Sequence, residues 1–210
     1  MGAGPVESRP FCPESRQEVA ALARIDSKEA EFAAVLDAAK AMVAAARTSP
    51  KTRGLDSVKM VILTGEDLEP LAAAMAAKQS QKAHPLPFFT RDANNVRASE
   101  AVLLIGVTGE PKKPEDPLNC GGCGHATCAE FLQQERLEGE DFRGPSCIFQ
   151  MIDLGIALGV AAKVASEWGI DNRMMFTIGA AARRIGALQA DVVIGFPLAV
   201  SGKNPFFDRP

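Results

Sequence analysis

The stretch LNCGGCGHATCAEF, residues 118–131, together with GPSC at residues 144–147, decides how the middle of this chain is built. It brings three cysteines within nine residues, and a fourth cysteine follows after a gap of 18 residues. The four are Cys120, Cys123, Cys128 and Cys147. Cysteines clustered in this way are more typical of a metal site than of a disulfide framework.

Glycines at positions 121, 122 and 124 separate the first three cysteines. Glycine adopts positive φ without a steric penalty, so such a loop can wrap closely around a metal cluster and point backbone N–H groups at its sulfurs. Gly144 and Pro145 precede the fourth cysteine and predict a turn that returns the chain to the site. We therefore expect the four cysteines to bind a [4Fe–4S] cluster.

Two other interpretations of the cysteines stay open, namely zinc and free thiols. A zinc site of four cysteines usually pairs two short Cys-x-x-Cys segments, whereas the second half here contributes a single cysteine. His125 lies inside the loop and is either a hydrogen-bond donor to a cluster sulfur or a solvated loop residue. The fifth cysteine, Cys12, stands far upstream, and we leave it out of the ligand set.

The composition of the 210 residues, 47% hydrophobic and 23% charged, fits one compact domain. We expect residues 1–210 to form this single domain and residues 118–148 to be a ferredoxin-like module inserted into it. With 11 Phe, one Trp and no Tyr, the core is expected to be aliphatic and rich in alanine. The net charge of −3 offers no basic field for a polyanion, so nucleic acid is not an expected partner.

Hydrophobic periodicity predicts a mixture of helices and strands, and hence an α+β fold. The expected helices are Glu14–Ile25, Lys28–Ala46 with Ser27 as its cap, a helix from Thr64 to about Lys78, Cys147–Trp168 and Ile178–Leu188. The second of these has an apolar face made of Phe32, Val35, Leu36, Ala39, Met42 and Val43. The expected strands are Val58–Leu63, Ala101–Val107, Met174–Phe176 and Ala190–Phe196. Prolines at 85 and 87 leave Ser80–Asn95 without a clear prediction.

The sequence gives no indication of a membrane protein. No continuous apolar run reaches the roughly 18 to 20 residues that a bilayer requires. The N-terminal residues MGAGPVESRPFCPESR lack the basic and then apolar pattern of a signal peptide. We therefore expect a cytoplasmic protein without a membrane partner.

The cysteine segment resembles the short four-iron domain of a subunit of the membrane-associated ferredoxin:NAD reductase and of the corrinoid iron–sulfur protein. Those domains share the Asn-Cys-Gly-x-Cys-Gly start, a third cysteine after a gap of four residues, and a distant fourth. The whole chain is similar to a family of uncharacterised prokaryotic proteins that contain a ferredoxin domain. The similar segments are AARTSPKTRGLDS, LNCGGCGHATCAEF, DLGIALGVAAKVASEWGIDNRMMFTIG and VVIGFPLAVSGKNPFFDR. This resemblance implies the cluster but no particular reaction.

Three further segments resemble the nitroreductase fold, whose members bind FMN at a homodimer interface. They are Ala44–Asp56, Asp153–Gly169 and Ile194–Arg209. The resemblance implies a nitroreductase-like scaffold carrying the inserted four-cysteine loop, FMN as a second cofactor, and a homodimer. Two motifs of that family are missing: no early Arg-x-Ser motif occurs before Lys28, and Arg53-Gly54-Leu55 stands in place of Gln-Pro-Trp.

A basic segment supports the flavin hypothesis without the resemblance. Arg47, Lys51 and Arg53, with the hydroxyl of Ser49, can neutralise a phosphate and hydrogen-bond the edge of a flavin. Two cationic residues of the C-terminal tail can add to this set; these are Lys203 and Arg209. The alternative is that the segment is a solvated basic loop.

A pair of glycines, Gly155 and Gly159, lies four residues apart on one face of the helix that follows the cysteines. Such a face permits the close approach of a second helix or of a flat ligand. The partner helix belongs either to the same subunit or to a second copy of the chain.

These observations predict an iron–sulfur redox protein in which a [4Fe–4S] cluster passes single electrons to a bound flavin, which reduces a small substrate or a partner protein. Two alternatives are a flavin-free electron carrier and a protein in which the metal has a structural or sensing role. An electron-donor or electron-acceptor protein is the expected partner. No nucleophile–base pair, dinucleotide motif or P-loop motif occurs, so no catalytic residue is assigned.

Overall fold

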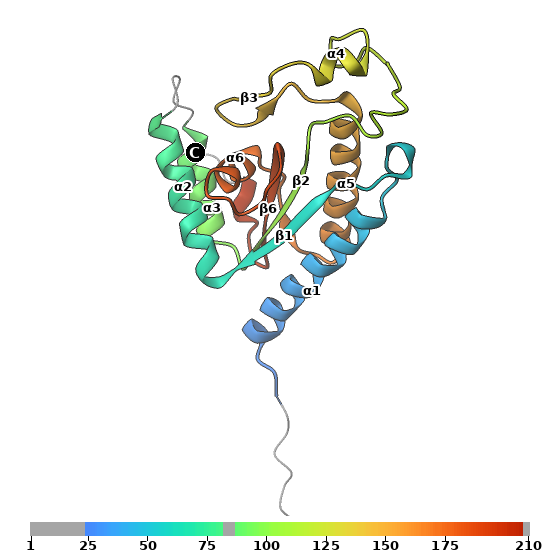
Figure 1. Ribbon diagram of the computed structural model, residues 1–210. Coiled ribbons are helices and arrows are strands. Elements are labelled where there is room, and N and C mark those ends of the chain that lie inside the picture. The colour runs from blue at the N-terminus through green and yellow to red at the C-terminus, as the bar shows by residue number, and fades with distance from the viewer. Residues whose placement is uncertain (1–23, 82–86, 208–210) are drawn as a thin grey trace, which may run out of the picture.

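A computed structural model describes residues 24–81 and 87–207 of the chain. Its centre is a four-stranded antiparallel sheet in the order β1-β2-β6-β5, with helices on both faces (Figure 1). The strands are β1 (Lys59–Thr64), β2 (Ala101–Val107), β5 (Asp171–Asn172) and β6 (Val192–Ala199). A second sheet pairs β3 (Leu137–Glu138) with β4 (Arg143–Gly144).

The helices of the described residues lie on the two faces of this sheet, except for α4, which lies beyond one end of it. They are α1 (Ser27–Thr48), α2 (Leu68–Gln81), α3 (Phe88–Arg97), α4 (Cys128–Leu132), α5 (Ile148–Glu167) and α6 (Phe176–Arg184). Short 3₁₀ turns are η1 (Thr52–Gly54), η2 (Gly65–Asp67) and η3 (Pro205–Phe207). The mixture of helices with an antiparallel sheet confirms the α+β prediction.

Strand β2 lies inside the sheet, and all 7 of its residues are buried. It pairs with β1 on one side and with β6 on the other, so that Ile105 lies opposite both Met60 and Ile194. A strand with both faces covered is expected to be a continuous apolar run, which is what AVLLIGV at residues 101–107 provides. The predicted bounds of this strand are therefore confirmed.

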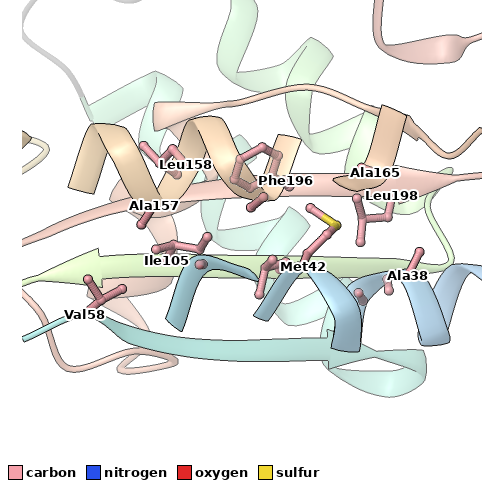
Figure 2. Packing of buried hydrophobic residues seen from close by; sticks show 14 of the residues in the cluster. Ala38, Met42, Val58, Ile105, Ala157, Leu158, Ala165, Phe196 and Leu198 are labelled. Atoms are coloured by element: carbon pink, nitrogen blue, oxygen red, sulfur yellow. The ribbon is translucent and has the colours of Figure 1, made fainter. Parts of the chain in front are cut away.

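Helices α1 and α5 pack against each other on one face of the sheet (Figure 2). Ala38 and Ala157 are fully buried there, and such small side chains let the helices approach closely. Met42 of α1 and Phe196 of β6 fill the space between the helices and the strands. The core is rich in alanine and other aliphatic residues, as the composition predicts.

Helices α2, α3 and α6 cover the opposite face of the sheet. Their buried side chains form a cluster with Leu104 of β2, and include Met75 of α2, Val96 of α3 and Ile178 of α6. Helix α6 lies so close to β6 that a Cβ atom on Gly179 would stand 1.7 Å from the carbonyl oxygen of Val193. This sheet between two helical layers forms the scaffold of the protein.

Several element boundaries differ from the prediction. Helix α1 is capped by Asp26, whose carboxylate accepts from the backbone N–H of Glu29, and Ser27 is already helical. Phe32, expected in the buried face, is 44% exposed because it lies near the free end of α1. Most of the expected helix Glu14–Ile25 lies outside the described residues, and its last two residues are not helical.

One predicted strand lies elsewhere, and the segment left without a clear prediction contains a helix. The strand expected at Met174–Phe176 lies at Asp171–Asn172, and only Met175 makes an isolated bridge, with Gly195 of β6. Helix α3 follows directly after Pro87, which occupies its N-cap position. A proline at the start of a helix is tolerated, so this proline did not disrupt a helix but marked its beginning.

Helix α5 is long and apolar enough, by length and composition, to cross a membrane. The sequence contains no continuous apolar run of that length because Gln150, Asp153 and Lys163 interrupt it. The inner side of α5 is buried against α1 and the sheet, with Leu154 and Ala161 among the buried residues. These contacts are those of a core helix.

The contact of Gly179 with β6 gives a direct test of this packing. We expect Gly179→Ala to lower the free energy of unfolding by about 3 kcal/mol or more, because the new methyl group would overlap backbone atoms that cannot move freely. Gly202→Ala is the matched control, since nothing lies within 4 Å of its added Cβ and the change should alter the free energy of unfolding little. Urea unfolding followed by circular dichroism measures both, and equal effects of the two changes would contradict the packing.

Candidate metal centre

The four cysteines lie on the segment that connects β2 to α5, which we call the cysteine loop (residues 108–147). This loop contains α4 and the β3–β4 hairpin, and it lies beyond one end of the central sheet, at the top of Figure 1. Cys128 is the first residue of α4, with Thr127 as its cap, and Cys147 is the N-cap residue of α5. Two of the predicted ligands are therefore fixed at helix ends.

Three of the predicted ligands line one small pocket: Cys120, Cys128 and Cys147. The other residues of the pocket wall are Thr52, Arg53, Pro111, Lys112, Leu118 and Phe149. Cys147 is buried and Cys120 is exposed, so the pocket connects the protein interior with the surface. The fourth predicted ligand, Cys123, is half-buried and lies outside this lining.

The loop between the cysteines has the backbone shape that its glycines predict. Gly121 and Gly124 have φ of 73° and 89°, and the N–H of Gly124 donates to the carbonyl of Gly121 at 3.0 Å. Asn119 closes the loop, because its side-chain oxygen accepts from the backbone N–H of Cys128 at 2.9 Å. Gly122 serves packing instead, since a Cβ there would lie 2.7 Å from the side chain of Ile148.

The geometry can be compared with the needs of a single zinc ion and of a four-iron cluster. Zinc requires all four sulfurs within about 2.3 Å of one point. Within residues 24–81 and 87–207, no three His, Cys, Asp or Glu side chains are grouped so that they could hold one metal ion. In a four-iron cluster each cysteine binds a different iron, so the thiols surround the cluster and do not have to converge on one point.

The sequence leaves open the roles of His125 and Cys12, and the structure describes only His125. The ring of His125 packs edge to face on Phe131, with the ring centroids 5.9 Å apart. This contact gives His125 a packing role inside the loop. Cys12 lies outside the described residues.

Asp191, directly before β6, attaches the cysteine loop to the scaffold. Its carboxylate accepts from the backbone N–H of Gly109 at 2.8 Å and from Arg136 at 2.9 Å, and Arg143 lies 3.9 Å away. Burial raises the pKa of Asp191, but the Gly109 N–H and the two guanidinium groups outweigh it and hold the pKa below the ordinary 3.8. Both the start and the later part of the loop are therefore held by one carboxylate.

A second buried carboxylate, Asp153 of α5, lies behind the cysteine pocket. It accepts from the backbone N–H and the hydroxyl of Thr52 at 2.9 and 2.8 Å, and it forms an ion pair with Lys112. These contacts join α5, η1 and the cysteine loop. Lys112, Asp153 and Asp191 were not predicted from the sequence as functional residues, although an acidic residue within the apolar stretch of α5 was a usable signal.

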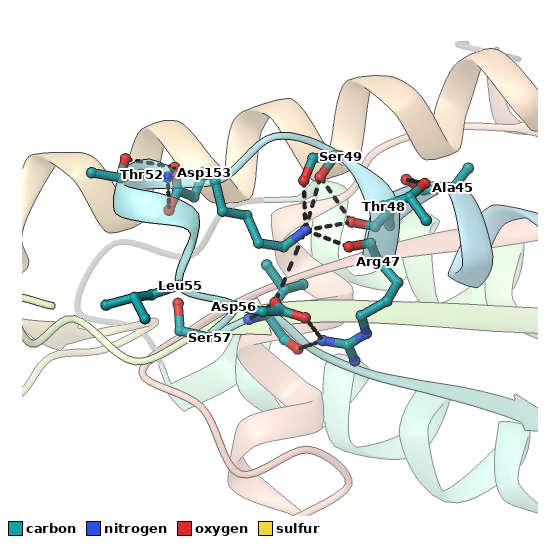
Figure 3. A network of polar contacts seen from close by, with 12 residues as sticks. Ala45, Arg47, Thr48, Ser49, Thr52, Leu55, Asp56, Ser57 and Asp153 are labelled. Carbon is teal, nitrogen blue, oxygen red and sulfur yellow. Dashed lines mark hydrogen bonds and ion pairs between the residues drawn. The ribbon is translucent and has the colours of Figure 1, made fainter.

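The predicted flavin-binding residues lie in and after the last turn of α1 (Figure 3). The ammonium group of Lys51 donates to the carbonyl oxygens of Ala46, Arg47 and Ser49 at 3.1, 2.6 and 2.8 Å, and its side chain is only 5% exposed. Lys51 therefore satisfies the last carbonyls of α1, in the manner of a C-terminal capping cation. The hydroxyl of Ser49 also donates into this helix end, to Ala46 at 2.8 Å.

The two arginines of the set are paired as well. Arg47 donates to the carboxylate of Asp56 and to the carbonyl of Val58. Burial raises the pKa of Asp56, but the hydrogen bonds from Arg47 and from the backbone N–H of Val58 outweigh it and hold the pKa below 3.8. Arg53 donates to the backbone and carboxylate oxygens of Asp116. Arg209 lies outside the described residues. The described residues of the set thus already have protein partners, and their role towards a flavin stays a prediction.

The anchoring role of Asp191 predicts a pH-dependent stability. A carboxylate whose pKa is lowered by folding stabilises the fold above its unfolded pKa and loses that contribution as the pH falls through its folded pKa. We expect Asp191→Asn to lower the free energy of unfolding by about 2–3 kcal/mol at pH 7, because it weakens hydrogen bonds to charged and buried groups.

The difference between wild type and Asp191→Asn should shrink as the pH falls below about 4, where the wild-type carboxyl also becomes neutral. Urea unfolding of the metal-free protein at several pH values measures this. Glu110→Gln is the control, since Glu110 is 63% exposed and lies 3.7 Å from the same Arg136. A pH-independent difference would contradict the assignment.

Comparison with known proteins adds to this geometry. The family described as "Uncharacterized protein containing a ferredoxin domain (DUF2148)" matches residues 143–209, which include Cys147. A protein of Archaeoglobus fulgidus, described as an uncharacterized protein, is 45% identical over 187 residues, covering 88% of this chain and 97% of the relative.

Solved structures share the fold at low sequence identity. A nitroreductase-like family protein from Bacillus cereus aligns with a TM-score of 0.51 at 11% identity, over 90% of this chain and 94% of that one. A nitroreductase with bound FMN from Desulfitobacterium hafniense has a TM-score of 0.47 at 13% identity, with 82% of each chain covered. The scaffold is therefore nitroreductase-like, as expected. The chain belongs to the family of proteins that contain a ferredoxin domain.

Proposed function

We propose that this protein is an electron-transfer protein that holds a [4Fe–4S] cluster on Cys120, Cys123, Cys128 and Cys147. The observation that carries the proposal is the shared pocket of three of these thiols, beside a glycine loop that carries the fourth. Membership of a ferredoxin-domain family and a nitroreductase-like fold both point to a redox protein. When bound, such a cluster accepts and donates single electrons.

Hydrogen bonds and helix ends fix the cysteines that would hold the cluster. Cys147 is fixed by its place at the start of α5 and by its backbone N–H, which donates to the carbonyl of Gly109 at 2.7 Å. Cys128 is fixed by Asn119 and by the short helix α4. The exposed Cys120 lies on the outer side, where an electron-donor or electron-acceptor protein can approach. Free cysteines of this kind stay reduced, and so able to bind a cluster, in a reducing compartment. This supports a cytoplasmic location.

The first test measures iron, acid-labile sulfide and the absorption spectrum of anaerobically prepared protein. We expect about four iron and four sulfide per chain, with the broad absorption of a thiolate-bound cluster. Changing Cys120, Cys128 or Cys147 singly to serine should remove most of the iron. Cys12→Ser is the matched control and should retain it. Stoichiometric zinc with no sulfide would overturn the proposal.

A bound FMN is the second part of the proposed function. It rests on the nitroreductase-like fold and on the resemblance of three segments to that family. The Gly155–Gly159 face of α5 is open, with nothing within 4 Å of an added Cβ, and Ile152 and Ile156 beside it are exposed. No residue of 24–81 or 87–207 comes within 4 Å of these added Cβ atoms, and we propose this face as the contact with a second copy of the chain. A homodimer with FMN at its interface would follow, reducing a small substrate.

The contacts of Lys51 predict how its replacement changes the stability and the FMN content of the protein. We expect Lys51→Met to lower the free energy of unfolding by about 1–2 kcal/mol, because the last carbonyls of α1 lose a nearly buried cation. FMN bound per chain should stay at the wild-type level, since this ammonium group is engaged with three carbonyl oxygens. Flavin fluorescence after equilibrium dialysis measures FMN content, and light scattering on the same sample gives the oligomeric state.

Lys40→Met is the matched control, because Lys40 is 68% exposed on the same helix and should change neither quantity. Loss of FMN from folded Lys51→Met would instead place the flavin phosphate at this loop. If the wild type binds no FMN at all, the flavin-free electron carrier is the correct function.

A further inference from the structure

The wall of the cysteine pocket contains a buried cation. The side chain of Lys112 is only 6% exposed, and its ammonium group donates to the carbonyl oxygen of Leu55 at 2.5 Å and to the carboxylate of Asp153. Lys112 lines the same pocket as Cys120, Cys128 and Cys147. The cation is therefore held beside the thiols by two acceptors.

The counterion of this lysine, Asp153, does not belong to the residues that line the pocket. Asp153 is 1% exposed on α5 and does not line the pocket, whereas Lys112 does. The hydroxyl and N–H of Thr52 hold the carboxylate in this place. Of the two members of this ion pair, only the cation belongs to the lining that contains the thiols.

The other charges near the pocket are expected to act on the thiols less strongly than Lys112. Arg53 also lines it, but its partner Asp116 is 66% exposed, so solvent screens that pair. Among the residues that line the pocket there is no carboxylate. A charge buried in a region of low dielectric acts on its neighbours more strongly than a charge in water.

We propose that Lys112 raises the reduction potential of the cluster held by the four cysteines, and that Asp153 positions it for this role. The inference rests on the proposed function. In the one-electron reduction, an external reductant gives one electron to the cluster, whose net charge becomes more negative by one. A fixed cation beside the thiols stabilises the reduced state more than the oxidised state, and therefore favours reduction.

The test is a spectroscopic redox titration of the reconstituted full-length protein under anaerobic conditions. We expect Lys112→Met to move the midpoint potential to a more negative value. A tenfold decrease in the ratio of reduced to oxidised cluster at fixed potential corresponds to about 59 mV for one electron. Lys113→Met is the matched control, because Lys113 is the neighbouring residue but is exposed, and its potential should equal that of the wild type.

Two further variants separate charge from structure. Lys112→Arg keeps the positive charge and should retain the wild-type potential. Asp153→Asn removes the counterion and should move the potential to a more positive value, opposite to Lys112→Met. If Lys112→Met fails to load iron, Lys112→Gln replaces it in the titration, because it removes the charge but keeps a hydrogen-bond donor for Leu55 and Asp153, and its potential should also be more negative than that of the wild type.

The iron and sulfide content of the wild type separates a failure of the proposed function from a failure of the role of Lys112. A wild type without iron and sulfide overturns the proposed function. A loaded wild type whose potential is unchanged in both Lys112→Met and Asp153→Asn, or shifted equally by Lys113→Met, overturns the role of Lys112 alone.

Discussion

The pairing of β2 with β6 constrains the rest of this structure. Strand β2 ends at Val107, and Val192, the first residue of β6, is the partner of Val107 in the ladder. The cysteine loop therefore begins beside the residue that precedes β6. Asp191 uses this proximity, because its backbone N–H donates to the carbonyl of Val107 while its carboxylate holds Gly109 and Arg136. The start of the cysteine loop is thus anchored where the sheet places β6 beside β2.

The scaffold and the cysteine loop share residues and are not merely adjacent. Cys147 belongs to the proposed ligand set and is also the N-cap residue of α5, whose inner face forms part of the core. Asp153, less than two turns further along α5, binds η1 and Lys112 of the loop. A change in the packing of α5 would therefore move Cys147 and Asp153, the two residues by which this helix contacts the cysteine loop.

The sequence predicted those features that depend on residue type and local spacing. The cysteines, the positive φ of Gly121 and Gly124, and the limits of β2 all belong to this class, since each follows from neighbours within a few positions. Lys112 and Asp153 are 41 residues apart and meet only because α5 returns beneath the loop, so no local pattern indicates their contact.

The basic residues near the end of α1 show a second limit of sequence reasoning. Spacing shows that Arg47, Lys51 and Arg53 are close to one another, but it does not show which acceptors they face. In the folded chain Lys51 turns back onto the carbonyl oxygens of its own helix, and the arginines find Asp56 and Asp116. A cation that follows a helix is as well suited to capping that helix as to binding an anion.

The fixed position of Lys112 has a consequence for the rate of electron transfer as well as for its direction. A side chain held by Leu55 and Asp153, with only 6% of its surface exposed, has little freedom to rotate when the charge beside it changes. Water around an exposed cluster would have to reorient at each transfer, whereas this preorganised cation would not. In the proposed electron-transfer protein, the buried ion pair would therefore lower the reorganisation energy on the inner side of the pocket, and solvent would respond at the outer side, next to Cys120.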